Sequence, residues 1–151
     1  YSIIGYRYGV RWGILGGVVY GLLQLLLGVN ALRGISLATV ALSVLLDYLL
    51  AFGVLGFSGL FRRKIQNQSA AFMAGAGIAI VLRFLCHFIS GAFVWDTILA
   101  DTGLNWAGIL YSFNYNGSYM LPELVITLVA GAILCRVFDF SKPNPIRRRA
   151  K

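Results

Sequence analysis

Residues 36–61 read SLATVALSVLLDYLLAFGVLGFSGLF. This stretch can cross a membrane as one helix, because a span needs roughly 20 mainly apolar residues at about 1.5 Å of rise per residue. It carries one charge, Asp47, near its middle. A charge at the centre of a spanning helix costs about 2.5–3.5 kcal/mol and usually marks a functional site. The stretch therefore predicts a membrane helix built around a polar site.

Three further stretches have the same apolar character, at about 9–28, 69–95 and 117–138. The chain of 151 residues is 59% hydrophobic and 12% charged, with a mean hydropathy of +0.79. Soluble globular domains are about 25% charged, so this composition excludes an ordinary soluble protein. We expect an all-α integral membrane protein, a polytopic helix bundle whose four spans form a single transmembrane domain over residues 1–151.

The formal net charge of +8 comes from basic residues that gather at one end of the predicted bundle. If the four helices alternate in direction, one side of the membrane receives Arg7, Arg11, Arg62, Arg63, Lys64, Arg136, Lys142, Arg147, Arg148, Arg149 and Lys151. The other side receives only Arg33. The positive-inside rule then places both termini and the 62–68 loop in the cytoplasm, and the 29–35 and 96–116 loops outside.

Because this placement of the basic residues accounts for the net charge, nucleic acid is not an expected partner. The basic tail is either an orientation signal or a contact for anionic membrane lipid.

Small residues recur at helical spacing in the first span, where Gly9, Gly13, Gly17 and Gly21 are four residues apart. They lie on one helix face and let another helix approach closely. Packing within the bundle is the simpler interpretation, and a face reserved for another subunit is the alternative. Cys86 and Cys135 also fall within spans and show no ligand spacing, so we expect them to serve packing.

The third span carries Arg83, His87, Gly91 and Trp95 at four-residue intervals, which places them along one face of an α-helix. Gly91 leaves a gap between the imidazole and the indole, and a flat ligand could occupy such a gap. The long 96–116 connection is rich in aromatic and amide side chains and is typical of a binding loop. The fourth span is expected to begin at Ser118, with Pro122 and Glu123 in its first turns.

A site that combines Asp47, His87, Trp95, Tyr111 and Asn116 would offer one buried anion, aromatic faces and an amide. This combination suits a flat, nitrogen-rich cation, because a carboxylate pairs with an amino-heterocycle and an indole attracts a ring cation. The alternative is structural. In that case Asp47 and Arg83 neutralise each other, and His87 is a hydrogen-bonded bridge between helices.

Three separated strings carry a resemblance to a known family. They are LDYLLAF at 46–52 with GLFRRK at 59–64, then RFLCHFISG at 83–91 with Trp95, then YSFNYNGSYMLPE at 111–123. In order and spacing the chain resembles the thiamine-specific S component of energy-coupling factor transporters, the ThiT or YuaJ family.

The resemblance implies a bacterial plasma-membrane protein that captures thiamine outside. It would deliver thiamine through a transmembrane T component and two cytoplasmic ATPase subunits. The chain has no Gly-x-x-x-x-Gly-Lys-Ser/Thr loop, so ATP would be used by those partners only.

By position, the resemblance implies a set of residues that bind the ligand: Asp47, Tyr48, His87, Gly91, Trp95, Tyr111 and Asn116. Arg83 and Glu123 lie inside the matching strings and are expected to support the site. The family has six helices, and we expect this chain to lack the first of them and the loop that follows. Asp47 replaces the Glu found in some members, and Leu37 stands where some have Tyr. No catalytic residue, metal ligand or bound cofactor is expected.

Three other functions fit parts of the pattern. A thiamine precursor such as hydroxymethylpyrimidine could be the ligand of the same fold. An intramembrane enzyme could use Asp47, His87, Ser90 or Glu123, although no triad or metal-ligand spacing emerges. A structural membrane subunit would need only the glycine stripes, with the polar residues fixing helix register.

Overall fold

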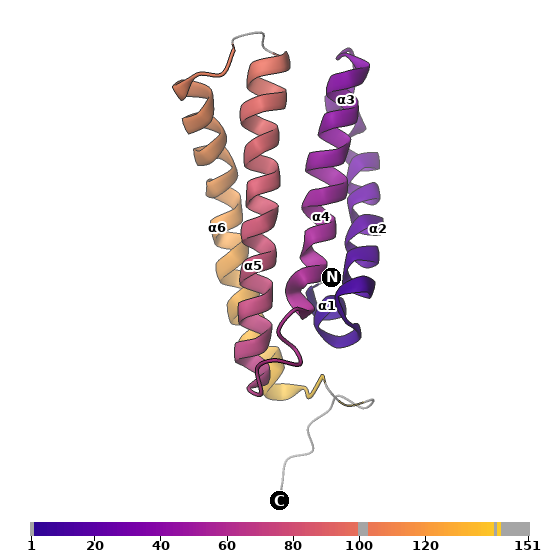
Figure 1. Cartoon of the computed structure of the whole chain (residues 1–151), viewed down its shortest axis with the longest axis vertical. Coiled ribbons are helices and arrows are strands. Elements are labelled where there is room, and N and C mark those ends of the chain that lie inside the picture. Colours follow the sequence, from indigo (N-terminus) through magenta and orange to yellow (C-terminus); the bar gives the residue numbers. More distant parts are fainter. Residues whose placement is uncertain (1, 100–102, 141, 143–151) are drawn as a thin grey trace, which may run out of the picture.

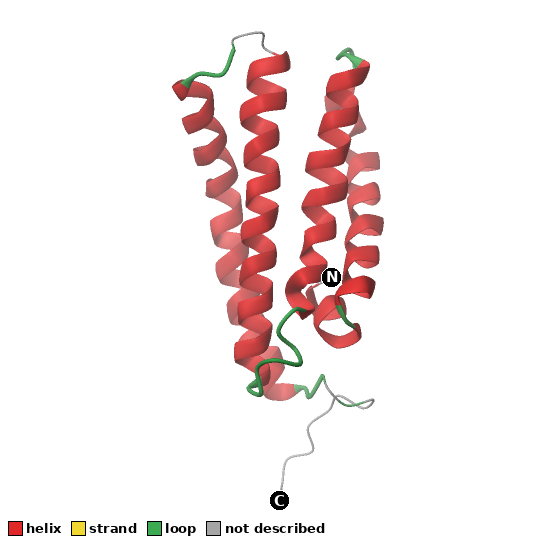
Figure 2. Ribbon diagram, in the orientation of Figure 1, coloured by secondary structure: helices red, strands yellow, loops and turns green. Residues whose placement is uncertain are grey.

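The computed structural model describes residues 2–99, 103–140 and 142. The described chain is mostly helical, with short loops between the helices, and contains no strand (Figure 2). Its elements are α1 Ser2–Tyr8, α2 Val10–Gly28, η1 Val29–Leu32, α3 Leu37–Ser43, η2 Val44–Leu50, α4 Ala51–Gly53, η3 Val54–Gly59, α5 Gln68–Ile89, η4 Ser90–Leu99 and α6 Trp106–Val137. The η1 and η3 segments are 3₁₀-helices, whereas η2 and η4 are π-helices.

Within the described residues, four continuous helical stretches are long and apolar enough to cross a membrane: Val10–Leu32, Leu37–Gly59, Gln68–Trp95 and Trp106–Val137. The predicted all-α membrane bundle with four spans is therefore confirmed. Three of these stretches begin at a polar cap. The side chains of Ser36, Asn67 and Asn105 accept hydrogen bonds from the backbone N–H groups of Thr39, Ala70 and Gly108. Such caps satisfy N–H groups that a helix start leaves unpaired.

The predicted start of the fourth span is wrong. The helix begins at Trp106 rather than at about 117, so Tyr111 and Asn116 lie on α6 and Pro122 is an interior residue. At 1.5 Å per residue its 32 residues extend about 48 Å, well beyond a hydrocarbon core of about 30 Å. Its outer turns are therefore free to be polar and aromatic, which made them resemble a loop. Glu123 consequently lies in mid-helix, where an acid gains nothing from the helix dipole.

The helices form two groups that meet along the bundle axis (Figure 1). On one side α5 packs along α6, and on the other α2 packs against the stretch from η2 to η3. The short helix α1 folds back beside α2 through Gly9, whose φ of 102° is readily adopted only by glycine. Gly9 thus makes a turn and is not part of the helical glycine stripe, contrary to expectation.

The other three stripe glycines pack inside the bundle, as the simpler interpretation predicted. A Cβ at Gly17 would overlap the carbonyl oxygen of Phe52, and one at Gly21 would overlap that of Tyr48. A Cβ at Gly13 would come within 2.7 Å of the Cα of Gly56. The α2 backbone therefore rests directly on the backbone of the second span, which only small residues permit.

Two apolar clusters fill the rest of the interior. One lies at the end of the bundle that holds α1 and the C-terminal end of α6, and contains Tyr6, Ala71, Phe72, Ala76, Cys135 and Phe140. The other lies nearer the middle, around Phe52, Leu55, Ala79, Ile80 and Met120. Large apolar side chains such as Leu26, Val81 and Val129 are more than half exposed and lie on the outside of the bundle. Small residues inside and large apolar residues outside are what a lipid-embedded bundle requires.

The contact at Gly17 gives a test of this packing. We expect Gly17→Ala to destabilise the protein by about 1–3 kcal/mol, because the added methyl group overlaps the backbone of α4. Gly77→Ala is the matched control, since a Cβ there meets nothing within 4 Å and alanine favours the helix. Thermal unfolding in detergent measures both. An equal response of the two variants would contradict the close α2–α4 contact.

Candidate functional site

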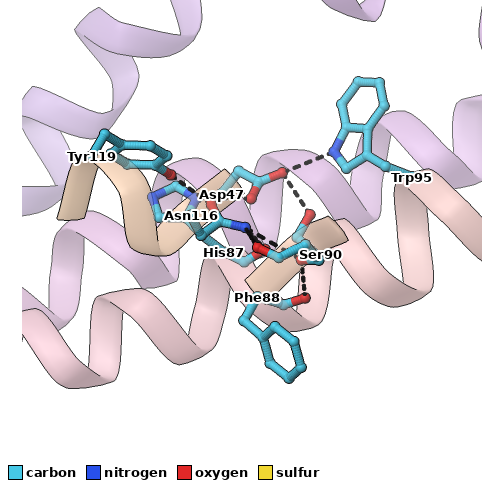
Figure 3. Close-up of polar contacts among 8 residues, drawn as sticks. Asp47, His87, Phe88, Ser90, Trp95, Asn116 and Tyr119 are labelled. Carbon is cyan, nitrogen blue, oxygen red and sulfur yellow. Dashed lines mark hydrogen bonds and ion pairs between the residues drawn. The ribbon is translucent and has the colours of Figure 1, made fainter. Parts of the chain in front are cut away.

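The carboxylate of Asp47, whose side chain is 16% exposed, is the centre of the polar network (Figure 3). One oxygen, Oδ1, lies 3.0 Å from Nδ1 of His87. The other, Oδ2, accepts hydrogen bonds from the hydroxyl of Ser90 at 2.6 Å and from the indole N–H of Trp95 at 3.2 Å. An ionised carboxylate can only accept, so the proton in the pair with His87 is on Nδ1. Three donors from one helix thus hold a single acid of another.

Two π-helical segments build this arrangement. Asp47 lies in η2, and Ser90 and Trp95 lie in η4. A π-helix bonds residue i to residue i+5, and π-turns occur frequently at functional sites. Ser90 and Trp95 are five residues apart and reach the same oxygen. The α-helical spacing used above predicted that Gly91 would share a face with His87 and Trp95, whereas Ser90 joins them at the carboxylate.

Gly91 has a different role from the gap that the sequence predicted. A Cβ at Gly91 would overlap the hydroxyl of Ser112, so the space beside it is taken by α6. The Ser112 hydroxyl donates to the carbonyl oxygen of Phe88 at 2.9 Å. The Asn116 amide donates to the carbonyl of Ser112 at 2.9 Å, and its oxygen accepts from the hydroxyl of Tyr119 at 2.6 Å. Gly91 therefore allows α6 to approach α5 at the level of Asp47.

A cavity of about 730 Å³ opens beside this network, a volume within the usual range of about 300–1,000 Å³ for small-molecule sites. All seven residues expected to bind a ligand line it: Asp47, Tyr48, His87, Gly91, Trp95, Tyr111 and Asn116. The other lining residues are Gln24, Leu27, Gly28, Phe52, Ser112, Tyr115 and Tyr119. We call this space the central cavity. Leu37, by contrast, is 85% exposed and does not line it.

Aromatic rings form one wall of the central cavity. Tyr111 and Tyr115 stack at 6.0 Å between ring centroids, and Tyr119 meets Tyr115 edge-on at 5.8 Å. The ring of His87 lies 6.4 Å from those of both Tyr119 and Phe52. Asp47 is the one acid among the lining residues, and none of them is Lys or Arg. The cavity therefore offers a fixed negative charge beside electron-rich ring faces, a combination that attracts flat cations.

Arg83 and Glu123 lie outside the central cavity. Arg83 forms an ion pair with Glu123 and not with Asp47, so the proposed Asp47–Arg83 pair is wrong. Its guanidinium also lies 4.6 Å from the centroid of the Phe52 ring, which lines the cavity floor. The expected bridge from His87 to another helix does occur, with Asp47 as its partner. Arg83 and His87 of the third span are thus both paired with acids on other helices.

Sequence reasoning missed several lining residues, chiefly Ser112, Tyr115 and Tyr119. The signal was present, because Tyr111, Tyr115 and Tyr119 repeat every fourth residue, as do Ser112 and Asn116. Recognising this spacing would have required reading 106–117 as a helix. No group of three or more His, Cys, Asp or Glu side chains in the described part of the chain could hold a metal ion.

Comparison with known proteins gives the chain a family. Residues 1–141 match the family described as Thiamine transporter protein (Thia_YuaJ). The chain is also 30% identical over 145 residues to the thiamine transporter ThiT of Bacillus subtilis (strain 168), an alignment that covers 90% of this chain and 69% of that relative. Among solved structures none matches significantly. The chain therefore belongs to the Thia_YuaJ family of thiamine transporter proteins, which are membrane transporters and not enzymes.

Proposed function

We propose that this chain binds thiamine in the central cavity and is the substrate-binding S component of an energy-coupling factor transporter. It would take thiamine from the outer face of a bacterial plasma membrane and pass it on with the help of a T component and two ATPase subunits. The observation that carries the proposal is the hydrogen-bonded, partly buried Asp47 carboxylate at the edge of an aromatic cavity. Family membership supports thiamine as the cargo.

The chemistry of thiamine fits the residues that line the central cavity. Thiamine joins an aminopyrimidine, which has N–H donors, to a positively charged thiazolium ring. Asp47 can accept from the amino group, and the rings of Trp95, Tyr48 and Tyr111 can face the cation. In Asn116 the amide nitrogen is already bonded to Ser112, and the oxygen accepts from Tyr119 with one lone pair left over. Asp47 and Asn116 therefore both present oxygen atoms that can accept from a ligand, which suits the amino group of thiamine.

The two ends of the bundle differ in a way that supports capture from outside. The central cavity is lined by Gln24, Leu27 and Gly28 from the end of α2 that leads into the 33–36 turn, which we expect to be extracellular. The opposite end is filled by the cluster around Phe72. There the Gln68 side chain also donates to the carbonyl oxygens of Cys135 and Phe138 and accepts from the N–H of Phe140. The bundle thus holds the central cavity toward the end with the 33–36 turn. At the opposite end, side-chain packing and the hydrogen bonds of Gln68 close it.

Binding can be measured directly on the purified protein. We expect thiamine to quench the fluorescence of Trp95, and Asp47→Asn to weaken binding at least about tenfold, because a hydrogen bond to a charged partner is lost. Asp139→Asn makes the same chemical change outside the central cavity and should leave the Kd unchanged. Absence of saturable quenching in the wild-type protein would overturn the proposal. If the thiazole half of thiamine adds no affinity in competition, a pyrimidine precursor is the ligand instead.

The pair of Arg83 and Glu123 is proposed to support the floor of the central cavity. We expect Glu123→Gln to destabilise the protein by about 1–2 kcal/mol, because the largely buried Arg83 guanidinium loses a charged partner that is itself only partly buried. Arg83→Glu combined with Glu123→Arg is the matched control, since the exchange restores opposite charges and should recover part of the loss. Thermal unfolding in detergent reports both. A double variant less stable than either single one would contradict a pairwise role.

The proposed orientation is testable by labelling. In a variant without Cys86 and Cys135, a new cysteine at Arg33 should react with a membrane-impermeant maleimide in intact cells, because the 29–35 loop is expected outside. A cysteine at Lys64 should react only after the cells are permeabilised. The reverse pattern would place both termini outside the cell and overturn the assignment.

A further inference from the structure

Ser90 carries a buried hydroxyl group that belongs to the site. Direct contact with a ligand does not explain its role there. It is fully buried and is not among the residues that line the central cavity. Its Oγ nevertheless donates to Oδ2 of Asp47 at 2.6 Å, the shortest of the three contacts to that carboxylate. Any influence of Ser90 on a ligand must therefore pass through Asp47.

The three donors constrain the carboxylate differently. His87 contacts Oδ1, whereas Ser90 and Trp95 share Oδ2. The terminal torsion of an aspartate is broad and roughly two-fold, so a carboxylate turns easily unless both of its oxygens are fixed. Trp95 is the weaker anchor at 3.2 Å, and its side chain lines the central cavity where a ligand can displace it. Ser90 lies behind the carboxylate, out of a ligand's reach.

We propose that Ser90 is a positioning residue, which fixes the plane of the Asp47 carboxylate and so presents it to the ligand. When thiamine takes the place of the Trp95 indole N–H, the Ser90 hydroxyl keeps Oδ2 in position. This inference rests on the proposed function, because it assumes that Asp47 contacts the ligand. The inference also assigns a role to the π-helical turns of η4, because they bring Ser90 and Trp95 to the same oxygen atom, Oδ2 of Asp47.

Ser43 provides a matched control for this role. It is another fully buried serine, and it lies on α3 one turn before Asp47. Its Oγ has no hydrogen-bond partner among the described residues. Removing either hydroxyl deletes one buried oxygen atom, but only the Ser90 hydroxyl contacts the carboxylate. A general effect of packing would therefore act through both serines.

The experiment compares Ser90→Ala with Ser43→Ala in the full chain, using thiamine as the probe. We expect the Kd of Ser90→Ala to rise about tenfold, since a hydrogen bond to a charged group is lost, and that of Ser43→Ala to stay within about twofold. Unchanged affinity in Ser90→Ala, or an equal loss in Ser43→Ala, would overturn the inference while the wild-type protein still binds. Failure of the wild-type protein to bind thiamine overturns the proposed function instead.

A spectroscopic measurement separates positioning from general destabilisation. Trp12 and Trp106 are 63% and 78% exposed and can be replaced by Phe. The tryptophan fluorescence of this variant then comes from Trp95 alone. Ser90→Ala frees the oxygen that Trp95 shares, so the emission maximum of the ligand-free protein should shift, whereas Ser43→Ala should leave it in place. An unshifted maximum in Ser90→Ala would overturn the inference, because it would show that the hydroxyl does not hold Oδ2.

Discussion

The site depends on one partly buried acid, Asp47, which requires hydrogen-bond donors inside the membrane span. A carboxylate placed inside a membrane span is strongly unfavourable unless it is paired and hydrogen-bonded. Asp47 finds its donors on the neighbouring span, from His87, Ser90 and Trp95. Their bonds link the two groups of helices at the level of the central cavity. The same acid that would oppose insertion thus fixes the relative position of the helices that line the site.

Close backbone contacts at several glycines also hold the helices together around the hydrogen bonds of Asp47. Gly17 and Gly21 rest on carbonyl groups of the second span, and Gly91 allows Ser112 to reach α5. Lipid provides little hydrophobic drive for helices to associate, so dispersion and polar contacts at such interfaces supply most of the stability. At the end that carries α1, the cluster around Phe72 fills the interior, whereas the opposite half contains the central cavity. The proposed binding of a ligand requires such a division, with a packed base and a cavity at the other end.

The π-helical turns illustrate how local backbone geometry serves the site. A regular α-helix would turn Ser90 and Trp95 to different sides, because residues five apart are not neighbours on its surface. The wider turn of η4 brings them together, and η2 carries Asp47 opposite them. Two such segments that meet at the Asp47 carboxylate, beside the cavity, are consistent with the frequent occurrence of π-turns at functional sites.

The sequence by itself determined the membrane bundle and the number of its spans, and it favoured internal packing of Gly13, Gly17 and Gly21. These follow from apolar length and helical spacing, which are local properties. It also named seven residues that the fold gathers around one cavity, while their contact with thiamine stays a prediction.

Only the tertiary structure decided that Arg83 pairs with Glu123, that Ser90 joins His87 and Trp95 at Asp47, and that Tyr111 and Asn116 stand on a helix. Partner choice among buried charges depends on which helix faces meet. A π-turn changes those faces without leaving a mark in the hydrophobic pattern.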